Sequence, residues 1–425
     1  MSDDFPRVLF VTSAAFNKIT GGGITFSNLF RGWPRDRLAT VTSDTVPVSD
    51  DVCDTYFHLE GEIARLGSGP RPPGGRARPA MAPTNTPHRA AWKTRLKTLA
   101  VGNAFPDRGR LSPELDTFIT AFKPDVIFTI LGTIGMMELV GAIHHRTGAA
   151  LVVHFMDDWP ATLYRGGLLS VLARRRMEVL LRRLTADARL CLGIGDHMCT
   201  AYARRYGTPF TPFQNPVDTA RIAAPRPAVP AASPARVVYC GSIFSNAQSE
   251  SLIEIGAAIA ELNRSGRPAR LEIYSPPFLA APFRDRLLAH AGVALHDTIS
   301  DDESFFALIA QADLLLLPVN FDRESRTFIR YSMPTKLPAY LASGTPVLGY
   351  GPPEVAQLAV LADEGCGLVV GRRDSDALVE GLRRILDDGA LRADLSAAAI
   401  ARAATQHDGD RIRARFQAAL RGAAS

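Results

Sequence analysis

The sequence of 425 residues lacks any long apolar segment. It contains no run of about 18 uncharged apolar residues, so it predicts no membrane-spanning helix. At its start, MSDDFPRVLFVTSAAF, acidic residues stand where a secretory signal peptide carries basic ones. We therefore expect a cytoplasmic protein.

Cysteine is scarce, and its positions form no metal-binding or redox pattern. The five cysteines are Cys53, Cys191, Cys199, Cys240 and Cys366. Their number is odd, no CxxC occurs, and four of them lie in or beside apolar runs, so we interpret them as buried free thiols. Because HExxH and Cys/His clusters are also missing, the sequence predicts no metal site.

The composition shows no excess of charge and no shortage of apolar residues. Hydrophobic residues make up 46% and charged residues 21%, as in ordinary soluble globular proteins. The length exceeds the roughly 250 to 300 residues at which a single core stops growing. We therefore expect two domains.

Positive charge is concentrated in residues 61–110, which contain ten Lys or Arg against two acidic residues. The first part, GSGPRPPGGRARPAMAPTNTP, has the proline and glycine content of a mobile insertion. In the second part, Trp92, Leu96 and Leu99 recur at helical spacing between basic residues. This spacing predicts a basic amphipathic helix.

Two interpretations of this basic segment remain open. One is a solvated surface helix, and the other is a contact with an anionic membrane surface, which would place the protein at the inner face of the membrane. Because no recognised nucleic-acid motif accompanies the charge, we expect no nucleic-acid partner.

Short apolar runs alternate with helical patterns along the chain, which predicts an α/β protein with parallel sheets and crossover helices. The runs in the first half are RVLFVTS, LATVTS, DVIFTIL, ALVVHF and LCLGIG; those in the second are RVVYCG, ARLEIYS, ADLLLLPV, TPVLGYG and GLVV.

A proline-rich stretch near the middle indicates a boundary between two similar α/β halves. We predict a first domain at 1–218 and a linker at 219–235. The second domain is predicted at 236–405, and a C-terminal helix at 406–425 is expected to cross back to the first domain. Ligands are expected in the loops at the carboxyl ends of the strands.

Three consecutive glycines, Gly21, Gly22 and Gly23, follow the first predicted strand and precede a helix. Glycine lets backbone amides approach an anion closely, and a helix amino terminus favours negative charge. A phosphate or an acceptor fits this place; a flexible turn explains the glycines equally well. The dinucleotide fingerprint GxGxxG is absent, which argues against an NAD-dependent oxidoreductase.

A second candidate site, VVHFMDDWP, follows a buried strand and places His154, Asp157 and Asp158 near its carboxyl end. A carboxylate there is able to orient or deprotonate a hydroxyl group, so we consider all three residues candidates for catalysis. The alternatives are that Asp158 caps the turn before Trp159 and that His154 is a core histidine.

The segment LCLGIGDHMCTAYARRYGTPFTPFQNPVD combines a D-x-M helix, R-Y-G, a strand and N-P-V-D. In this order it resembles the glycosyltransferase family 4 group, and the resemblance extends over the chain apart from the basic insertion. It implies the GT-B fold, in which two Rossmann-like domains with parallel sheets face each other across a cleft.

In that family a helix start holds the nucleotide diphosphate, and YSMPTKLPAYLASGTPV has the same length and ending. Pro334 suits a first helical turn, Thr335 and Lys336 offer amides and a cation, and Gly344 suits the helix end. The resemblance therefore implies a nucleotide-binding set that comprises Gly241, Arg330, Tyr331, Ser332, Pro334, Thr335 and Lys336 together with Gly21, Gly22 and Gly23.

The sequence departs from the family at two places. Tyr331 and Ala339 occupy the positions of the two glutamates that grip the donor sugar and the ribose. The segment YCGSIFSNAQSESL lacks the basic residues that the family commonly places after the first strand of its second domain. Lys336 is the best candidate to replace them, with Arg330 and other arginines nearby in sequence.

The resemblance implies a glycosyltransferase of hexosyltransferase type that moves a sugar from a UDP- or GDP-linked donor to a glycan or lipid-linked acceptor. It further implies retention of configuration, no metal, no separate cofactor and a place in cell-surface polysaccharide synthesis. The main alternative is a catalytically degenerate GT-B protein that acts as a binding or assembly partner, and a lesser one is a nucleotide-sugar epimerase.

Overall fold

The computed structural model describes residues 5–44, 48–65, 72–76, 106–167, 170–299 and 301–425. The chain divides into two compact units: Met1–Gln214 together with Arg413–Ser425, and Asn215–Ile412. Each unit is built on one parallel sheet, so the predicted α/β class is confirmed. The predicted basic helix around Trp92, Leu96 and Leu99 lies outside the described residues.

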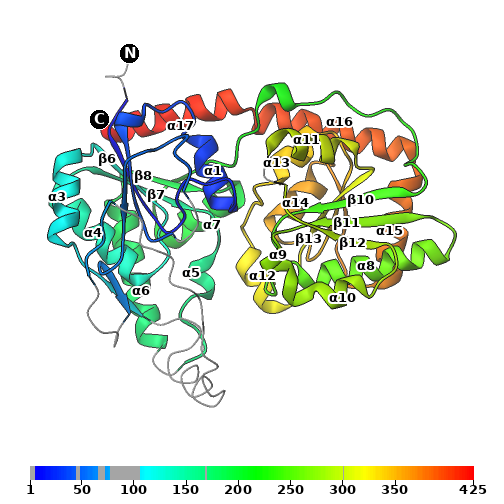
Figure 1. The fold of residues 1–425 in the computed structure, drawn as a ribbon, viewed down its shortest axis with the longest axis horizontal. Helices are drawn as coiled ribbons and strands as arrows, with labels where there is room; N and C mark the ends of the chain where they lie inside the picture. Colours follow the sequence, from blue (N-terminus) through cyan, green and yellow to red (C-terminus); the bar gives the residue numbers. More distant parts are fainter. Residues whose placement is uncertain (1–4, 45–47, 66–71, 77–105, 168–169, 300) are drawn as a thin grey trace. The chain divides into compact units, whose positions relative to one another are not determined.

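Within the described residues, the first unit contains a seven-stranded parallel sheet (Figure 1). Its strands are β1 (Val8–Thr12), β2 (Leu38–Thr42), β3 (Tyr56–His58), β6 (Val126–Thr129), β7 (Ala150–Phe155), β8 (Leu190–Gly193) and β9 (Phe210–Pro212). They lie in the order β3-β2-β1-β6-β7-β8-β9. The loops after β1 and β6 therefore diverge at the switch point where open α/β sheets bind ligands.

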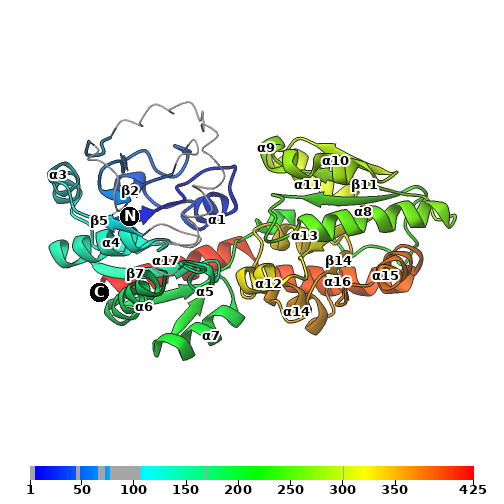
Figure 2. The same ribbon diagram turned by 90° about the horizontal axis from the view of Figure 1, so that it is seen from below.

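Helices cover both faces of this sheet. They are α1 (Gly21–Leu29), α3 (Pro113–Phe122), α4 (Ile134–Thr147), α5 (Trp159–Thr162), α6 (Ser170–Asp187) and α7 (Asp196–Tyr206). Because right-handed crossovers that run in opposite directions place their helices on opposite faces, α1 lies on one side of the sheet and α6 on the other (Figure 2).

Side-chain caps and glycines explain where several of these helices begin and end. The Ser112 hydroxyl accepts a hydrogen bond from the Leu115 amide at the start of α3. Gly148 and Gly207, with φ of 69° and 73°, end α4 and α7 in the left-handed conformation that glycine favours.

The base of the basic segment forms a small antiparallel ribbon of β4 (Ile63–Arg65) and β5 (Asp107–Gly109). Beside it, the buried Glu62 carboxylate accepts hydrogen bonds from the Gly74 amide at 2.9 Å and from the Ser112 hydroxyl at 2.6 Å. Both ends of the segment are thus anchored to the first unit.

Within the described residues, the second unit contains a six-stranded parallel sheet in the order β12-β11-β10-β13-β14-β15. The strands are β10 (Ala235–Cys240), β11 (Ala269–Tyr274), β12 (Val293–His296), β13 (Leu314–Pro318), β14 (Val347–Tyr350) and β15 (Leu368–Val370). The switch point lies between β10 and β13, so the loop after β10 and the segments that approach it form the expected ligand edge.

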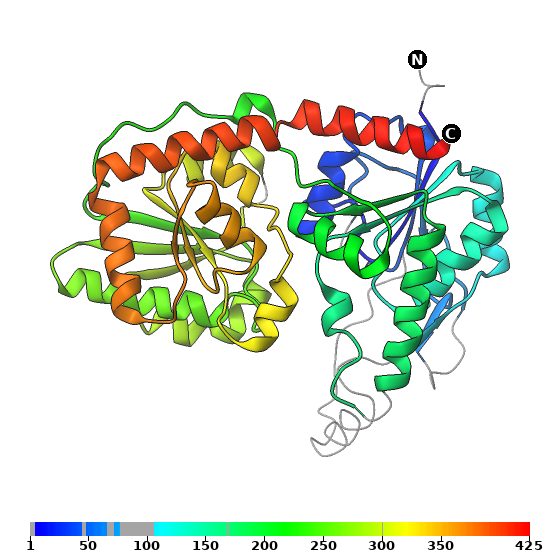
Figure 3. The ribbon, with the colours of Figure 1, turned by 180° about the vertical axis from the view of Figure 1, so that it is seen from behind.

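The helices of the second unit also lie on both sides of its sheet, with α15 and α16 in front in Figure 3. They are α8 (Ser249–Arg264), α9 (Pro277–Ala280), α10 (Arg284–Leu288), α11 (Asp302–Gln311), α12 (Arg323–Ile329), α13 (Leu337–Ala342), α14 (Ala356–Asp363), α15 (Ser375–Asp387) and α16 (Gly389–Gln406). None of the helices in the described part of the chain has the length and apolar character that crossing a membrane requires.

The segment predicted as a linker, residues 219–235, packs as part of the second unit. The Ala223 amide donates to the Ala342 carbonyl at 2.8 Å, and the Ala231 amide donates to the Leu386 carbonyl at 2.7 Å. The prolines prevent regular structure here, but they leave enough amides to fix the segment on α13 and α15.

The last helix, α17 (Gly409–Ala424), supplies an aromatic anchor to the first unit. Phe416 is fully buried, and its ring lies 5.0 Å from Phe30, 5.4 Å from Phe213 and 5.7 Å from Phe128 between centroids. The end of the chain therefore completes the core of the unit in which the chain began.

We expect Phe416→Ala to lower the free energy of unfolding of the first unit by about 3–5 kcal/mol, because it leaves a cavity in an aromatic cluster. All three tryptophans lie within residues 1–214, so tryptophan fluorescence during urea unfolding reports on this unit. Phe278→Ala, at a side chain 71% exposed in the second unit, is the control and should change little. Equal stability of the two variants would contradict the packing.

Candidate functional site

The loop between β1 and α1 is organised by one buried side chain, Asn17. Its carbonyl oxygen accepts hydrogen bonds from the amides of Ile19 at 2.9 Å and Thr20 at 2.7 Å, and its amide donates to the Ala15 carbonyl at 2.8 Å. Asn17 thus fixes the approach of the chain to α1. The sequence analysis did not identify it, because a single Asn in a loop has many ordinary explanations.

The three predicted glycines have different roles at the start of α1. The Gly23 amide donates to the hydroxyl of the helix cap, Thr20, at 3.2 Å, and a Cβ on Gly23 would lie 2.2 Å from the Asn17 amide nitrogen. Gly23 is therefore needed for packing, and its amide already has a partner inside the loop. Gly21 is exposed and Gly22 partly exposed in the first turn, where the helix dipole favours negative charge.

The neighbouring helix α4 starts next to the same switch point, but its first amides are already bonded. Ile134 donates to the Tyr164 hydroxyl at 3.1 Å, Gly135 to the Asp107 carboxylate at 2.7 Å, and Met136 to its cap, Thr133, at 3.2 Å. Of these two helix starts, α1 is therefore the better candidate for an anionic ligand.

His154 lies in the core of the first unit and not at its surface. It is 1% exposed, and its ring packs edge-on against Phe26 and Phe128 with centroid distances of 5.6 and 6.0 Å. Burial lowers the pKa of His154 to about 3, so the imidazole is neutral at physiological pH. This environment favours the core-histidine alternative over a catalytic role.

Asp157 and Asp158 follow β7 directly but lie in different environments. Asp157 is partly exposed, whereas Asp158 is 5% exposed and accepts a hydrogen bond from the Tyr202 hydroxyl at 2.8 Å. Arg205 lies 3.7 Å from the same carboxylate oxygen of Asp158. Asp158 therefore ties the turn to α7, which favours the structural alternative for this residue, and Asp157 is the better candidate for catalysis.

In the second unit, the Lys336 side chain lies against the end of β10. Its amine is 3.6 Å from the centre of the Tyr239 ring, and a Cβ on Gly241 would lie 3.0 Å from that amine. Gly241, with φ of 142°, thus leaves the space that Lys336 occupies. The two residues are far apart in sequence, yet the fold brings both to the switch point of the second sheet.

The environment of Lys336 is unusual for an amine. Burial lowers the pKa of Lys336 to about 7, and among the described residues the structure gives it no carboxylate partner. A cation held over an aromatic ring without a counter-charge is suited to receive an anionic ligand. The Gly241 amide donates to the Tyr274 carbonyl at 2.9 Å, so Gly241 contributes space and not a hydrogen bond to a ligand.

The helix predicted around Pro334 begins three residues later than expected. α13 starts at Leu337, and Pro338, not Pro334, occupies its first turn. Gly344 follows the helix with φ of 65°, as predicted. The Thr335 carbonyl accepts a hydrogen bond from the Asn215 side chain at 3.0 Å, so the NPVD segment helps to fix the chain before Lys336.

The other predicted nucleotide-binding residues lie just before this turn. The guanidinium of Arg330 is 5.2 Å from the Tyr331 ring centre, and Ser332 is 8% exposed. Arg326 pairs with Glu354, which leaves Arg330 as the better second cation. The residues from Arg330 to Lys336 thus form one segment, and Gly241 lies beside Lys336 at the end of that segment.

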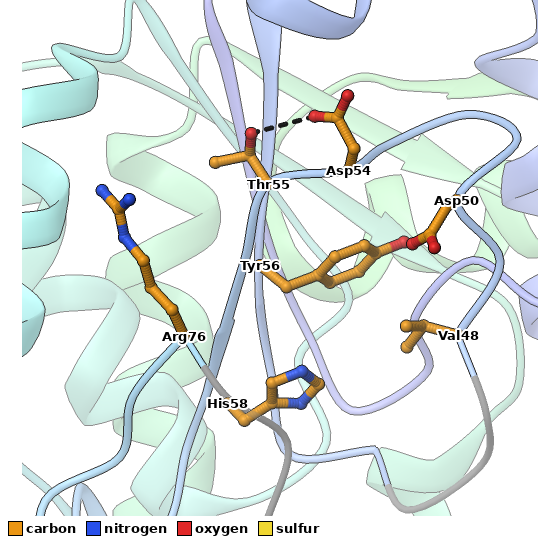
Figure 4. A pocket seen from close by; sticks show the side chains of 7 residues that line it. All are labelled: Val48, Asp50, Asp54, Thr55, Tyr56, His58 and Arg76. Carbon is orange, nitrogen blue, oxygen red and sulfur yellow. Dashed lines mark hydrogen bonds between the residues drawn. The ribbon is translucent and has the colours of Figure 1, made fainter.

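A polar cavity of about 340 Å³ lies beside the edge strand β3, away from all predicted site residues (Figure 4). Tyr56 and His58 point from the same face of the strand, with ring centroids 6.0 Å apart. The cavity is lined by Val48, Asp50, Asp54, Thr55, Tyr56, His58 and Arg76. Its carboxylates and guanidinium are able to bind hydroxyl groups. In the sequence, the one sign of this cavity is the spacing of Tyr56 and His58, which are two residues apart and therefore face the same side of a strand.

The cysteines and metal-ligating residues add no further site in the described part of the chain. All five cysteines are free and buried, which confirms their interpretation. No group of three or more His, Cys, Asp or Glu residues among the described ones is placed to hold a metal ion.

Comparison with known protein families gives one match, and it falls in the second unit. Residues 234–388 match the family model described as Glycosyl transferases group 1, and this range includes both Gly241 and Lys336. No curated protein sequence matches the chain.

Solved structures with the same fold cover almost the whole chain. Sucrose-phosphate synthase from Thermosynechococcus elongatus matches at 14% identity with a TM-score of 0.64, covering 96% of this chain and 97% of its own. WaaG, a glycosyltransferase involved in lipopolysaccharide biosynthesis, matches at 16% identity with a TM-score of 0.61 and coverage of 96% and 98%. HepE from Anabaena, solved with UDP and glucose, matches at 12% identity with a TM-score of 0.60 and coverage of 96% and 98%.

These findings confirm the resemblance to family 4-like glycosyltransferases and the GT-B fold class. The family match falls on the second unit, and the shared fold extends over both units.

Asp158→Asn should lower the free energy of unfolding by about 1.5–3 kcal/mol, because the hydrogen bond from Tyr202 to a charged group is weakened and Arg205 loses a nearby counter-charge. Asp157→Asn is the matched control and should be nearly neutral for stability. Tryptophan fluorescence during urea unfolding measures both. The assignment of Asp158 to structure fails if the two changes have equal effects.

Proposed function

We propose that this chain, whose second unit matches the glycosyl transferases group 1 family, is a glycosyltransferase that uses a nucleotide-sugar donor. The observation that carries the proposal is the Lys336 amine, which lies beside Gly241 at the switch point of the second sheet without a carboxylate partner among the described residues. A diphosphate supplies the negative charge that this amine lacks.

The electrostatics of the leaving group follow from this arrangement. When the bond between the sugar and the diphosphate breaks, negative charge grows on the phosphate oxygens, and a cation close to them stabilises the transition state. Lys336 is the proposed source of that charge, and Arg330 is the second candidate. They replace the basic residues that the segment after β10 lacks.

In the first unit, the start of α1 and Asp157 are the proposed contacts for the other reactants. Gly21 and Gly22 lie in a helix turn that favours an anion, and Asp157 is a partly exposed carboxylate after β7. We propose that Asp157 orients the acceptor hydroxyl or the transferred sugar.

The finer assignments rest on the resemblance. We propose a UDP- or GDP-linked hexose donor, a glycan or lipid-linked acceptor, retention of configuration and cell-surface polysaccharide synthesis. The reaction is proposed to need no metal ion, with Lys336 and the helix start providing the positive charge. We propose that the protein acts in the cytoplasm, at the inner face of the membrane.

The alternative function is a binding or assembly partner without catalysis. It is favoured by Tyr331 and Ala339, which stand in place of the two family glutamates. Ala339 is 7% exposed within α13, and because its side chain is a methyl group this position offers a ligand no carboxylate.

A screen of UDP- and GDP-sugars for release of free nucleotide, with and without glycan acceptors, tests the proposed activity. Transfer that depends on an acceptor supports the enzyme. Nucleotide binding by calorimetry without any turnover supports the partner, and absence of both binding and turnover would refute both functions.

We expect Lys336→Ala to weaken UDP binding by about 1.5–3 kcal/mol, the range for a hydrogen bond to a charged group, with little change in the melting temperature. Calorimetric titration measures the binding. An unchanged dissociation constant in the variant would remove Lys336 from the site.

The binding of UDP should also depend on pH through Lys336. Since the pKa of Lys336 is lowered to about 7, the amine loses its proton as pH rises from 7 to 8.5, and affinity should fall by up to about tenfold per pH unit. Lys336→Met, which keeps the length but not the charge, should bind weakly with no such dependence. A flat profile in the unaltered protein would contradict the lowered pKa.

Asp157→Asn should reduce turnover far more than donor affinity, because a residue that acts mainly in the transition state affects kcat more than binding. Steady-state kinetics with the donor identified in the screen measure both quantities. Full activity in this variant would show that Asp157 has no part in the chemistry.

A further inference from the structure

The segment that follows β7 contains a residue with an unusual backbone conformation, Tyr164. Among the described residues other than glycine, two have a positive φ, and these are Lys123 at 54° and Tyr164 at 55°. Lys123 ends α3 at an exposed position, which is an ordinary place for this conformation. Tyr164 is 1% exposed, and a bulky residue rarely adopts a left-handed conformation. Its conformation therefore has to be maintained by the structure around it.

The side chain of Tyr164 is held at the start of α4. Its hydroxyl accepts a hydrogen bond at 3.1 Å from the amide of Ile134, the first residue of that helix. The first amides of a helix have no partner within the helix, so the hydroxyl oxygen satisfies this one. Burial raises the pKa of Tyr164 to about 12, so the hydroxyl keeps its proton at physiological pH. Tyr164 is thus a neutral, buried connection between the segment after β7 and α4.

The start of α4 is itself fixed, because the ribbon of β4 and β5 lies against it. The Gly135 amide donates to the Asp107 carboxylate at 2.7 Å, and the Gly109 amide donates to the Glu138 carboxylate at 3.0 Å. A Cβ on Gly109 would lie 1.9 Å from the Gly135 carbonyl oxygen, so helix and ribbon are in direct backbone contact. The Tyr164 hydroxyl is therefore bonded to a part of the unit that has little freedom to move.

Asp157 lies in a short loop that α5 closes. The rings of Phe155, at the end of β7, and Trp159, at the start of α5, stack with their centroids 6.0 Å apart. The direction that the backbone takes at Asp157 therefore depends on where α5 lies. Because α5 is a single turn of four residues, it is too short to be stable without contacts at its ends.

Both ends of α5 have such contacts. At its start, Asp158 accepts a hydrogen bond from Tyr202 of α7 at 2.8 Å. At its end, the Leu163 carbonyl accepts one from Arg174 of α6 at 3.1 Å, and Tyr164 follows directly with its bond to α4. The Arg174 side chain is 28% exposed and flexible, whereas Tyr164 is buried. Tyr164 is therefore the more rigid of the two contacts at this end.

We propose that Tyr164 is a positioning residue for Asp157. By fixing the end of α5 on α4, its hydroxyl keeps the Asp157 carboxylate in the place where it orients a hydroxyl group of the acceptor or of the transferred sugar. The proposal rests on the proposed function of Asp157 and adds to it a residue that is too deeply buried to touch a substrate.

The left-handed backbone of Tyr164 supports this role. Backbone strain that the surrounding structure maintains is concentrated at functional sites. If ending α5 were the one role of this residue, glycine would serve at a lower conformational cost. The tyrosine side chain therefore has a further role, and its printed partner is the Ile134 amide.

Tyr164→Phe tests this role, because it removes one oxygen atom and keeps the buried ring. With the donor identified in the screen of nucleotide sugars, we expect kcat to fall about tenfold, since a displaced catalytic group loses much of its effect. The KM for the donor should stay unchanged. A hydrogen bond that serves stability alone would instead lower the melting temperature and leave kcat unchanged wherever the protein is folded.

Thr185→Val is the matched control. It also removes one buried hydroxyl group from the first unit, where Thr185 donates to the Leu181 carbonyl within α6 at 2.8 Å. We expect this variant to keep the kcat of the unaltered protein. Equal losses of kcat in the two variants would overturn the proposal, because they would show a general effect of stability.

The Asp157→Asn background shows whether Tyr164 acts through Asp157. In that background Tyr164→Phe should lower kcat by less than about twofold, because the carboxylate that it positions is already absent. Losses that multiply, or full turnover in Tyr164→Phe alone, would overturn this inference and leave the role of Asp157 intact. Full turnover in Asp157→Asn is a different result: it would contradict the proposed role of Asp157, and this inference would fail with it.

Hydrogen exchange measured by mass spectrometry tests the same contact without turnover. In Tyr164→Phe, peptides that cover residues 156–163 should exchange about tenfold faster, because the end of α5 has lost its bond to α4. Peptides from β7 and α7 should remain as protected as in the unaltered protein. Unchanged exchange in 156–163 would overturn the proposal even if the protein binds nucleotides and transfers no sugar.

Discussion

Burial of both faces of each parallel sheet is the constraint on which the rest of this structure depends. Strands such as β1 and β13 are buried at every position, so a polar group within them needs an internal partner or must stay neutral. Ligand chemistry is therefore restricted to the ends of the strands. At those ends, the loop after β1 and the segment before α13 provide exposed or partly exposed polar groups.

This constraint separates residues that look alike in sequence. His154, Asp157 and Asp158 lie within five positions, yet burial makes His154 a neutral core residue and Asp158 a partner of Tyr202. Asp157 is the one that reaches a partly exposed position. Successive side chains of a strand point to opposite faces of its sheet, and the turn after the strand changes their direction again. Neighbouring residues therefore reach different environments.

The second unit illustrates how a missing charge is replaced from a distant part of the chain. The segment after β10 has no basic residue, but Gly241 leaves room at its start for the amine of Lys336. Any side chain at Gly241 would meet this amine or adopt a strained backbone conformation. The glycine and the lysine are therefore best understood as a pair, in which one makes room for the charge of the other.

The sequence by itself determined the class of fold, because runs of four to eight apolar residues between helical patterns are compatible with little other than parallel sheets. It also indicated Lys336, and it located the end of α13 at Gly344, where a positive φ is required. These features depend on local chemistry, which a sequence displays directly.

Only the tertiary structure decided which polar residues are available. The contact of Gly241 with Lys336, the capping of Gly23 by Thr20, the role of Asn17 and the pairing of Asp158 with Tyr202 join residues through folded geometry. The start of α13 also lies three residues beyond the prediction, and the Asn215 side chain donates to the Thr335 carbonyl just before it. A sequence pattern gives the kind of each side chain, but burial and partners depend on what the fold places around it.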